Sequence, residues 1–158
     1  MSNLFGVIVA MAFFGIIFLA ILLVYYFLFA IGLYGLAKKA NLENPWVAFI
    51  PIAQLYTLGM LVKTVKIQDY EIPSLELVLP LGYLAVMILN KIPLIGFLLS
   101  IAYLVVFALT IYKLYNEYRP ESAVLWLILS IFILPILIFI MRNDSPVSKP
   151  ETDTGKNL

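Results

Sequence analysis

The sequence predicts an all-α membrane protein, a bundle of four transmembrane helices with one further helix that is re-entrant or interfacial. Of the 158 residues, 64% are hydrophobic and only 12% are charged, whereas a soluble domain carries about 25% charged residues. The mean hydropathy is +1.06. The apolar residues also gather in runs close to the length of about 20 that a helix needs to cross a bilayer. A surface this apolar suits lipid and not water, so a membrane is the expected environment.

The chain contains no cysteine and no histidine. Their absence removes disulfides, thiolate nucleophiles, the commonest general base and the commonest transition-metal ligand. Isolated hydroxyl residues in membrane helices more often bond their own backbone or a neighbouring helix than act as nucleophiles. We therefore expect no enzymatic activity, no catalytic residue, no cofactor and no bound metal. The net charge of +1 gives no reason to expect a nucleic-acid partner.

The first predicted helix is the uncharged run of residues 4–37, which ends at Lys38 and Lys39. It exceeds the range of roughly 17–25 residues for a transmembrane helix, so the helix must tilt or project from the hydrocarbon. Residues 1–3 carry no charged side chain, whereas a cleaved signal peptide begins with a basic region. The run is therefore expected to stay in the protein as its first membrane helix.

Residues 45–62 form the most unusual of the apolar runs. A helix of this length, preceded by a capping asparagine and with proline first, would barely cross a hydrocarbon core of about 30 Å. Pro51 removes a backbone hydrogen bond, and Gln54 and Thr57 are polar, which weakens a lipid-facing position. The segment is predicted to enter the cytoplasmic leaflet and return. The alternative is a complete crossing, which gives five spans.

Three further apolar runs predict the remaining spans, and a polar tail follows them. The runs are residues 77–90, lengthened at their start by 72–75, then 92–112 and 122–141. Residues 142–158 are rich in Ser, Pro, Thr, Asp and Lys, a composition typical of disorder. The chain is thus expected to comprise one polytopic membrane domain, residues 1–141, and a disordered polar tail.

The distribution of lysine and arginine favours the re-entrant alternative, because short loops rich in these residues stay in the cytoplasm. If residues 45–62 do not cross, six basic residues share one face: Lys38, Lys39, Lys63, Lys66, Lys113 and Arg119. Only Lys91 and Arg142 then lie near helix ends on the opposite face. A five-span chain would instead divide its basic residues four against six. Both termini are therefore expected outside, and the re-entrant segment on the cytoplasmic side.

Polar and interfacial residues near the membrane are the candidates for a site. Glu76 and Lys91 lie at the two ends of one short segment, so each is expected to reach its own interface. A polar path through the membrane would be lined by Gln54, Thr57, Glu76 and Asn90. The candidate interface or lining residues are Lys38, Lys39, Trp46, Pro51, Gln54, Tyr56, Thr57, Glu76 and Asn90.

Two stretches of the sequence are faintly alike. The first runs through Tyr34, Trp46 and Pro51, and the second through Tyr112, Trp126 and Pro135. Each passes from a helix end with tyrosine and basic residues, through a short loop, into an apolar helix that holds tryptophan and proline. The spacings from tryptophan to proline differ, five residues against nine, so an internal duplication stays a hypothesis.

The pattern LAKKANLENPWVAFIPIAQLYTLGML, residues 36–61, resembles small multi-pass bacterial membrane proteins of unknown function. In that family a basic helix end is followed by a Pro-Trp or Gly-Trp pair and an IPI…Y segment. The stretches NKIPLIGFLL and FILPILIFI are similar to its proline-containing helices. The resemblance covers most of residues 30–141 and implies a location in the bacterial cytoplasmic membrane. It brings no catalytic residues with it.

The function expected from these patterns is non-enzymatic and depends on helix or lipid contacts, as in an accessory subunit or an immunity or stress-protection protein. The partners would be the lipid bilayer and another membrane protein or a second copy of the chain. The alternative is a small transporter or channel that works as a homo-oligomer, because four spans alone enclose little space. A lipid-modifying enzyme comes third, since the chain lacks histidine and cysteine.

Overall fold

The computed structural model describes residues 2–67 and 70–147. Its elements, in chain order, are α1 (Ser2–Lys39), η1 (Pro45–Phe49), α2 (Ala53–Val62), β1 (Val65–Ile67), β2 (Tyr70–Ile72), α3 (Leu75–Leu89), α4 (Pro93–Tyr118), η2 (Pro120–Ser122) and α5 (Ala123–Met141). The predicted all-α class is confirmed, with one short antiparallel hairpin of β1 and β2 added between α2 and α3. Most of the predicted tail, residues 148–158, lies outside the described residues.

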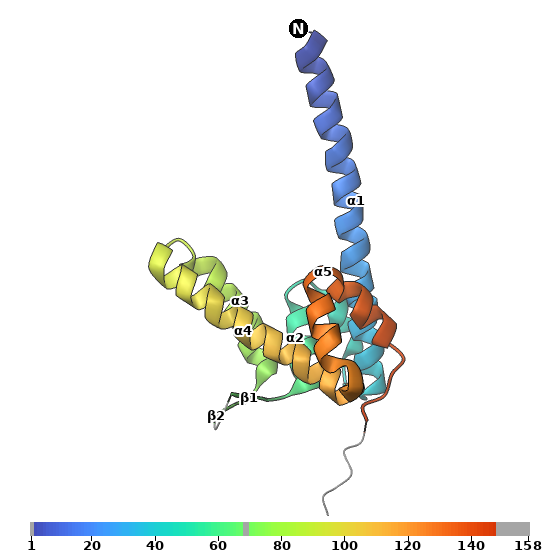
Figure 1. The fold of residues 1–158 in the computed structure, drawn as a ribbon, viewed down its shortest axis with the longest axis vertical. Coiled ribbons are helices and arrows are strands. Elements are labelled where there is room, and N and C mark those ends of the chain that lie inside the picture. The colour runs from blue at the N-terminus through green and yellow to red at the C-terminus, as the bar shows by residue number, and fades with distance from the viewer. Residues whose placement is uncertain (1, 68–69, 148–158) are drawn as a thin grey trace, which may run out of the picture.

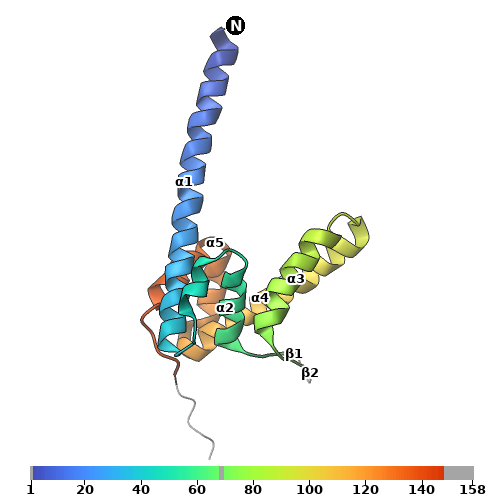
Figure 2. The ribbon, with the colours of Figure 1, turned by 180° about the vertical axis from the view of Figure 1, so that it is seen from behind.

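The helices meet in one cluster, from which two arms leave in different directions (Figures 1 and 2). We call this cluster the base: the C-terminal half of α1, η1, α2, α5, the first turns of α3 and the C-terminal half of α4. The buried core lies there, and its largest fully buried side chains are Leu33, Leu36, Leu58, Leu75, Leu79, Ile111, Leu114, Tyr115, Ile138 and Met141. One arm is the N-terminal half of α1, and the other is the α3–α4 hairpin.

The helix α1 consists of two parts with different surroundings. It is 38 residues long, which corresponds to about 57 Å at 1.5 Å per residue. Every side chain in residues 4–24 is exposed, whereas Ala30, Leu33, Leu36 and Ala37 are fully buried in the base. The predicted first helix is therefore one continuous helix, and only its second half has partners within the described chain.

The segment of η1 and α2 leaves the base and returns to it. Phe49, at the end of η1, accepts a hydrogen bond on its carbonyl from the Tyr26 hydroxyl. The backbone reverses at Ile52, whose φ of 67° lies in the left-handed region. After α2, the Val62 carbonyl accepts a hydrogen bond from Lys113 near the end of α4. This reversal is compatible with the re-entrant segment predicted for residues 45–62, which stays a prediction.

The helix α5 also reverses, which the sequence does not predict. Ile133 has non-helical φ and ψ of −131° and 28°, two residues before Pro135. Proline has no amide hydrogen, and its ring clashes with the carbonyl four residues earlier, so it bends or breaks a helix. The outgoing arm packs on α4, where the Tyr115 hydroxyl lies 2.7 Å from the Ser130 hydroxyl. The return arm packs on α1, close to Gly32 and Gly35.

Both ends of α5 therefore lie at the base, which differs from the predicted straight span of residues 122–141. The Arg119 guanidinium, just before α5, pairs with the Asp144 carboxylate at 2.7 Å. The amide of Val147 donates to the carbonyl of Glu117 over 2.8 Å. These contacts fasten the first residues of the predicted polar tail to the end of α4. Length and hydropathy alone could not reveal the reversal, because both arms are equally apolar.

The α3–α4 hairpin agrees closely with two predicted segments. A turn at residues 90–92 separates α3 from α4, and Pro93 occupies the first turn of α4. However, α4 continues to Tyr118, six residues beyond the predicted span of residues 92–112. The extra turns bring Lys113, Tyr115 and Tyr118 into the base, where both tyrosines are buried.

A substitution of Gly32 tests the contact between α1 and the return arm of α5. A Cβ atom at Gly32 would lie 2.7 Å from the carbonyl carbon of Ile138, so the two helices must separate in Gly32→Ala. We expect this variant to lower the free energy of unfolding by about 1–3 kcal/mol, as overpacking usually does. The measurement is thermal unfolding of the purified protein in detergent.

Gly15→Ala is the matched control, because no described atom lies within 4 Å of a Cβ there. It should keep the wild-type Tm. Equal melting temperatures for Gly32→Ala and Gly15→Ala would contradict the close approach of α5 to α1.

Candidate functional site

A cavity of about 380 Å³ lies at the point where the two arms separate. Its wall comes from α1, from the reversal between η1 and α2, and from the facing sides of α3 and α4. The lining residues are Tyr26, Pro51, Ile52, Gln54, Leu55, Tyr83, Tyr103 and Phe107. Cavities of about 300–1,000 Å³ with a mainly apolar lining are typical of small-molecule sites. None of the eight lining residues carries a charge.

Two side chains of this wall have polar atoms without a partner among the described residues. They are the amide nitrogen of Gln54 and the hydroxyl of Tyr103, both fully covered. Buried polar groups are nearly always hydrogen-bonded, and an unpaired one costs about 1–3 kcal/mol. Tyr26, by contrast, donates to the Phe49 carbonyl. The cavity wall therefore combines aromatic surface with two unsatisfied hydrogen-bonding groups.

The aromatic rings define the side of the cavity formed by the α3–α4 hairpin. Tyr83 on α3 and Tyr103 on α4 have ring centroids 6.3 Å apart, and Tyr103 stacks on Phe107 at 6.3 Å. Rings in such pairs attract each other through their quadrupoles. The arrangement can hold a neutral molecule with an apolar body and a hydrogen-bonding oxygen. In the described ranges no three Asp, Glu, His or Cys side chains gather where they could hold a metal ion.

Of the candidate residues from the sequence, Pro51 and Gln54 line this cavity. Thr57 is buried and donates to the carbonyl of Ala53 over 3.1 Å, so its hydroxyl bonds its own helix. The backbone of Glu76 packs against Gly59 at the base, and Asn90 is exposed at the far tip of the α3–α4 hairpin. The four residues proposed as one polar path therefore do not form one.

The other candidates are distributed over the surface of the base. Trp46 is 58% exposed at the start of η1, Lys38 and Lys39 are exposed at the end of α1, and Tyr56 is half-buried on α2. They do not join the cavity. Sequence reasoning missed Tyr26, Tyr83 and Tyr103, although a tyrosine in the middle of an apolar run is itself a signal, since its hydroxyl needs a partner in hydrocarbon.

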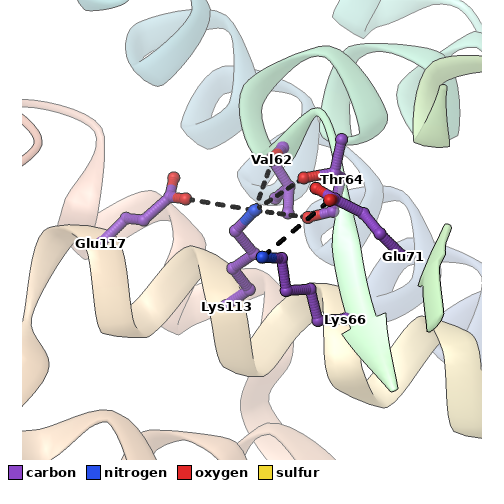
Figure 3. A network of polar contacts seen from close by, with 6 residues as sticks. All are labelled: Val62, Thr64, Lys66, Glu71, Lys113 and Glu117. Atoms are coloured by element: carbon purple, nitrogen blue, oxygen red, sulfur yellow. Dashed lines mark hydrogen bonds and ion pairs between the residues drawn. The ribbon is translucent and has the colours of Figure 1, made fainter. Parts of the chain in front are cut away.

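A polar network at the base holds the end of α2 against α4 (Figure 3). The Lys113 ammonium donates to the Val62 carbonyl over 3.3 Å, to the Thr64 carbonyl, and to the Thr64 hydroxyl over 3.3 Å. It also pairs with the Glu117 carboxylate at 3.7 Å. The last carbonyls of a helix lack intrahelical partners and carry partial negative charge. Lys113 therefore satisfies the end of α2 and fastens the first reversal to α4.

The nearby pair of Lys66 and Glu71 joins β1 and β2 at 3.9 Å. Both side chains are largely exposed, and pairs of this kind contribute little to stability. The Lys113 network was also missed by the sequence, which treated Lys113 only as part of a basic face. The sequence gives little indication of this network, because no residue near Lys113 in the chain reveals that α2 ends beside it.

The described residues thus define an all-helical protein with three helices long and apolar enough to cross a membrane, by length and composition: Leu4–Lys39, Pro93–Tyr118 and Pro120–Met141. This supports a membrane protein as the class. Comparisons with protein-family models, with curated proteins and with solved structures find no match for the chain.

Replacement of Lys113 tests the network. We expect Lys113→Met to remove the Lys113 donor from the Thr64 carbonyl and one of the two donors from the Val62 carbonyl, which keeps the Thr64 amide. The free energy of unfolding should fall by roughly 1–3 kcal/mol, as for hydrogen bonds to charged groups. Hydrogen exchange in the C-terminal turn of α2 should become faster, as measured by mass spectrometry. Lys91→Met, at the exposed tip of the hairpin, is the control and should exchange like the wild type. Wild-type exchange in Lys113→Met would show that the network does not hold α2.

Proposed function

We propose that this is a protein of the bacterial cytoplasmic membrane in which α1, α3 and α4 cross the bilayer. In this arrangement η1 with α2 forms one re-entrant hairpin and α5 forms a second, and the base faces the cytoplasm. The proposal replaces the expected four spans with three crossings and two hairpins. Although α5 is long and apolar enough to cross, its reversal at Ile133 makes it a hairpin here, and the shorter α3 crosses in its place. It also moves the C-terminal tail to the cytoplasmic side, because the chain leaves the described part at Val147, beside the end of α4.

The distribution of basic residues supports this orientation. In the described ranges seven of them lie in or directly beside the elements of the base, with Lys66 on the adjoining strand β1: Lys38, Lys39, Lys63, Lys66, Lys113, Arg119 and Arg142. Among the basic residues that the structure describes, only Lys91 lies away from the base, at the tip of the α3–α4 hairpin. Basic residues near helix ends favour the cytoplasmic side. Seven basic residues on one side against one on the other is a stronger asymmetry than the six against two, or four against six, that the two arrangements predicted from the sequence would give.

The backbone of the first reversal suits a position within hydrocarbon. There, every amide and carbonyl needs a partner within the protein. The amides of residues 53, 54 and 55 donate to the carbonyls of residues 51, 50 and 52 over 2.7, 3.0 and 2.9 Å. The helix α3 has 15 residues, or about 22 Å, so its crossing needs local thinning of the bilayer or a contribution from the preceding strand.

The function that we propose is non-enzymatic and depends on contacts with another helix or with lipid, as in an accessory subunit or an immunity or stress-protection protein. The observation that carries it is the N-terminal half of α1. Its residues 4–24 are all exposed. An 18-residue stretch of this helix has a mean hydropathy of 3.2, and none of its residues is buried. This arm is longer than its crossing requires and offers an apolar surface on every side.

Photocrosslinking in native membranes tests this function. A photoreactive amino acid at Phe13, 61% exposed on the free arm, should give adducts with a specific membrane protein or with a second copy of the chain. The same amino acid at Leu33, which is fully buried, is the control and should give none. Turnover of a substrate by the purified protein that a single polar substitution abolishes would contradict the proposal.

A small homo-oligomeric transporter or channel is the second candidate, and the cavity at Gln54 favours it. For this function, Gln54→Leu should reduce solute flux into liposomes, because it removes the polar group from the wall while it keeps the size of the side chain. Thr57→Val is the matched control, since that hydroxyl bonds to the carbonyl of Ala53. Flux no greater than in protein-free liposomes would remove this candidate.

Labelling of single cysteines tests the topology directly, because the chain has no cysteine of its own. Glu43→Cys, Lys66→Cys and Ser145→Cys should react with a membrane-impermeant reagent from the cytoplasmic side, and Lys91→Cys from the other. Labelling of Glu43→Cys and Lys66→Cys from opposite sides would mean that α2 completes a crossing. Labelling of Ser145→Cys from the side of Lys91→Cys would mean that α5 crosses.

A further inference from the structure

The two halves of the molecule contain very different amounts of helix. Near the base, α1, α4 and the start of α3 are joined by η1, α2 and the two arms of α5. Among the described helices, only α1, α3 and α4 continue beyond the two reversals (Figures 1 and 2). A helix with its side chains is about 10–12 Å across, so each helical segment occupies about 80–110 Å² of a leaflet. The four additional segments add about 320–440 Å² on one side only.

The depth of the two reversals determines which leaflet holds the additional helices. Phe49 is bonded to Tyr26 on α1, and Leu134 and Pro135 line a small cavity together with Tyr25 and Tyr26. Both reversals therefore lie at the same level of α1. Tyr26 is 13 residues before the end of α1 at Lys39, or about 20 Å, against a hydrocarbon core of about 30 Å. In the proposed orientation the hairpins therefore fill the leaflet around the base and end about 5 Å past the bilayer midplane.

The additional helices are held rigidly, so the leaflet must accommodate them. The return arm of α5 touches the backbone of α1 at Gly32, and its outgoing arm is bonded to α4 through Tyr115 and Ser130. Lys113 fastens the end of α2 to α4. Beyond the reversals the arms diverge (Figure 1), so in the proposed orientation they would be separated by lipid. The protein itself therefore has a wide base and a narrow opposite half.

From this shape we propose that the protein favours and stabilises curved membrane in which the leaflet around the base is the convex one. A wedge with its wide end in one leaflet expands that leaflet, and membrane insertion of this kind is sensitive to curvature. With the base in the cytoplasm, the convex surface faces the cytoplasm. The partner is thus the lipid surface itself. This inference rests on the membrane orientation proposed above.

The size of liposomes should control the orientation of the reconstituted protein. The full chain with a fluorescent label on Ser145→Cys, at the base, is reconstituted into phosphatidylcholine and phosphatidylglycerol vesicles of about 50 nm and about 400 nm diameter. An impermeant quencher reports the fraction of labels outside. Since the outer leaflet of a small vesicle is convex, the ratio of outward to inward bases should rise about twofold or more in the small vesicles, a population shift between two orientations.

A label on Lys91→Cys, at the opposite tip, serves as the reciprocal control and should become less accessible in the small vesicles. An equal outward fraction at both diameters, with the two labels still on opposite sides, would overturn the wedge and leave the proposed topology intact. Labels at Ser145→Cys and Lys91→Cys on the same side would instead overturn the topology, and the wedge with it.

Discussion

The backbone contact between α1 and the return arm of α5 at Gly32 is the constraint on which the rest of the base depends. Atoms of Ile138 and Phe139 lie so close to Gly32 that a Cβ atom there would meet them at 2.7 Å. In a membrane, helices associate mainly through such close packing, because apolar surface gains little by leaving lipid. The contact holds the return arm of α5 beside α1, and it places Arg142 next to Gly35. Once that arm is fixed, its outgoing partner must lie between α1 and α4, which sets the position of the buried Tyr115.

The sequence predicts the class of the fold and most of the helix positions, because these follow from local apolar runs. It also predicts the reversal of residues 45–62, where Pro51 and Gln54 interrupt the run and charged residues flank it. It does not predict the reversal of α5 at Ile133, although Pro135 is just as visible as Pro51. No polar residue accompanies Pro135, and a proline within an apolar run is compatible with a kinked span as well as with a reversal. The choice is made by Gly32 and by the pairing of Arg119 with Asp144, which are far from Pro135 in the sequence.

The candidate site was predicted in part for a similar reason. Gln54 stands out in the sequence as an amide in an apolar run, and it does line the cavity. Tyr83 and Tyr103 come from two other helices, and the sequence does not reveal that they meet Gln54. The faint likeness between the two Tyr–Trp–Pro stretches has a clearer structural counterpart. In each, a long helix ends at the base, a short 3₁₀ helix begins with proline, and a hairpin follows that reverses near a second proline. Both long helices end on the same side, as in a parallel repeat, although duplication itself stays a hypothesis.

The unsatisfied groups in the cavity wall distinguish the two candidate functions. A protein that acted only through its outer helix surfaces would gain nothing from an unpaired amide at Gln54, and an apolar side chain of the same size would make its fold more stable. A protein that binds a molecule at this level of the bilayer would recover that cost when the side chains that cover Gln54 or Tyr103 move aside and an oxygen of the ligand bonds there. The wedge shape is independent of this choice, because it depends on the two hairpins and not on what the cavity holds. Contact, transport and curvature therefore depend on three features of the molecule: the free arm of α1, the cavity at the first reversal, and the width of the base to which that reversal belongs.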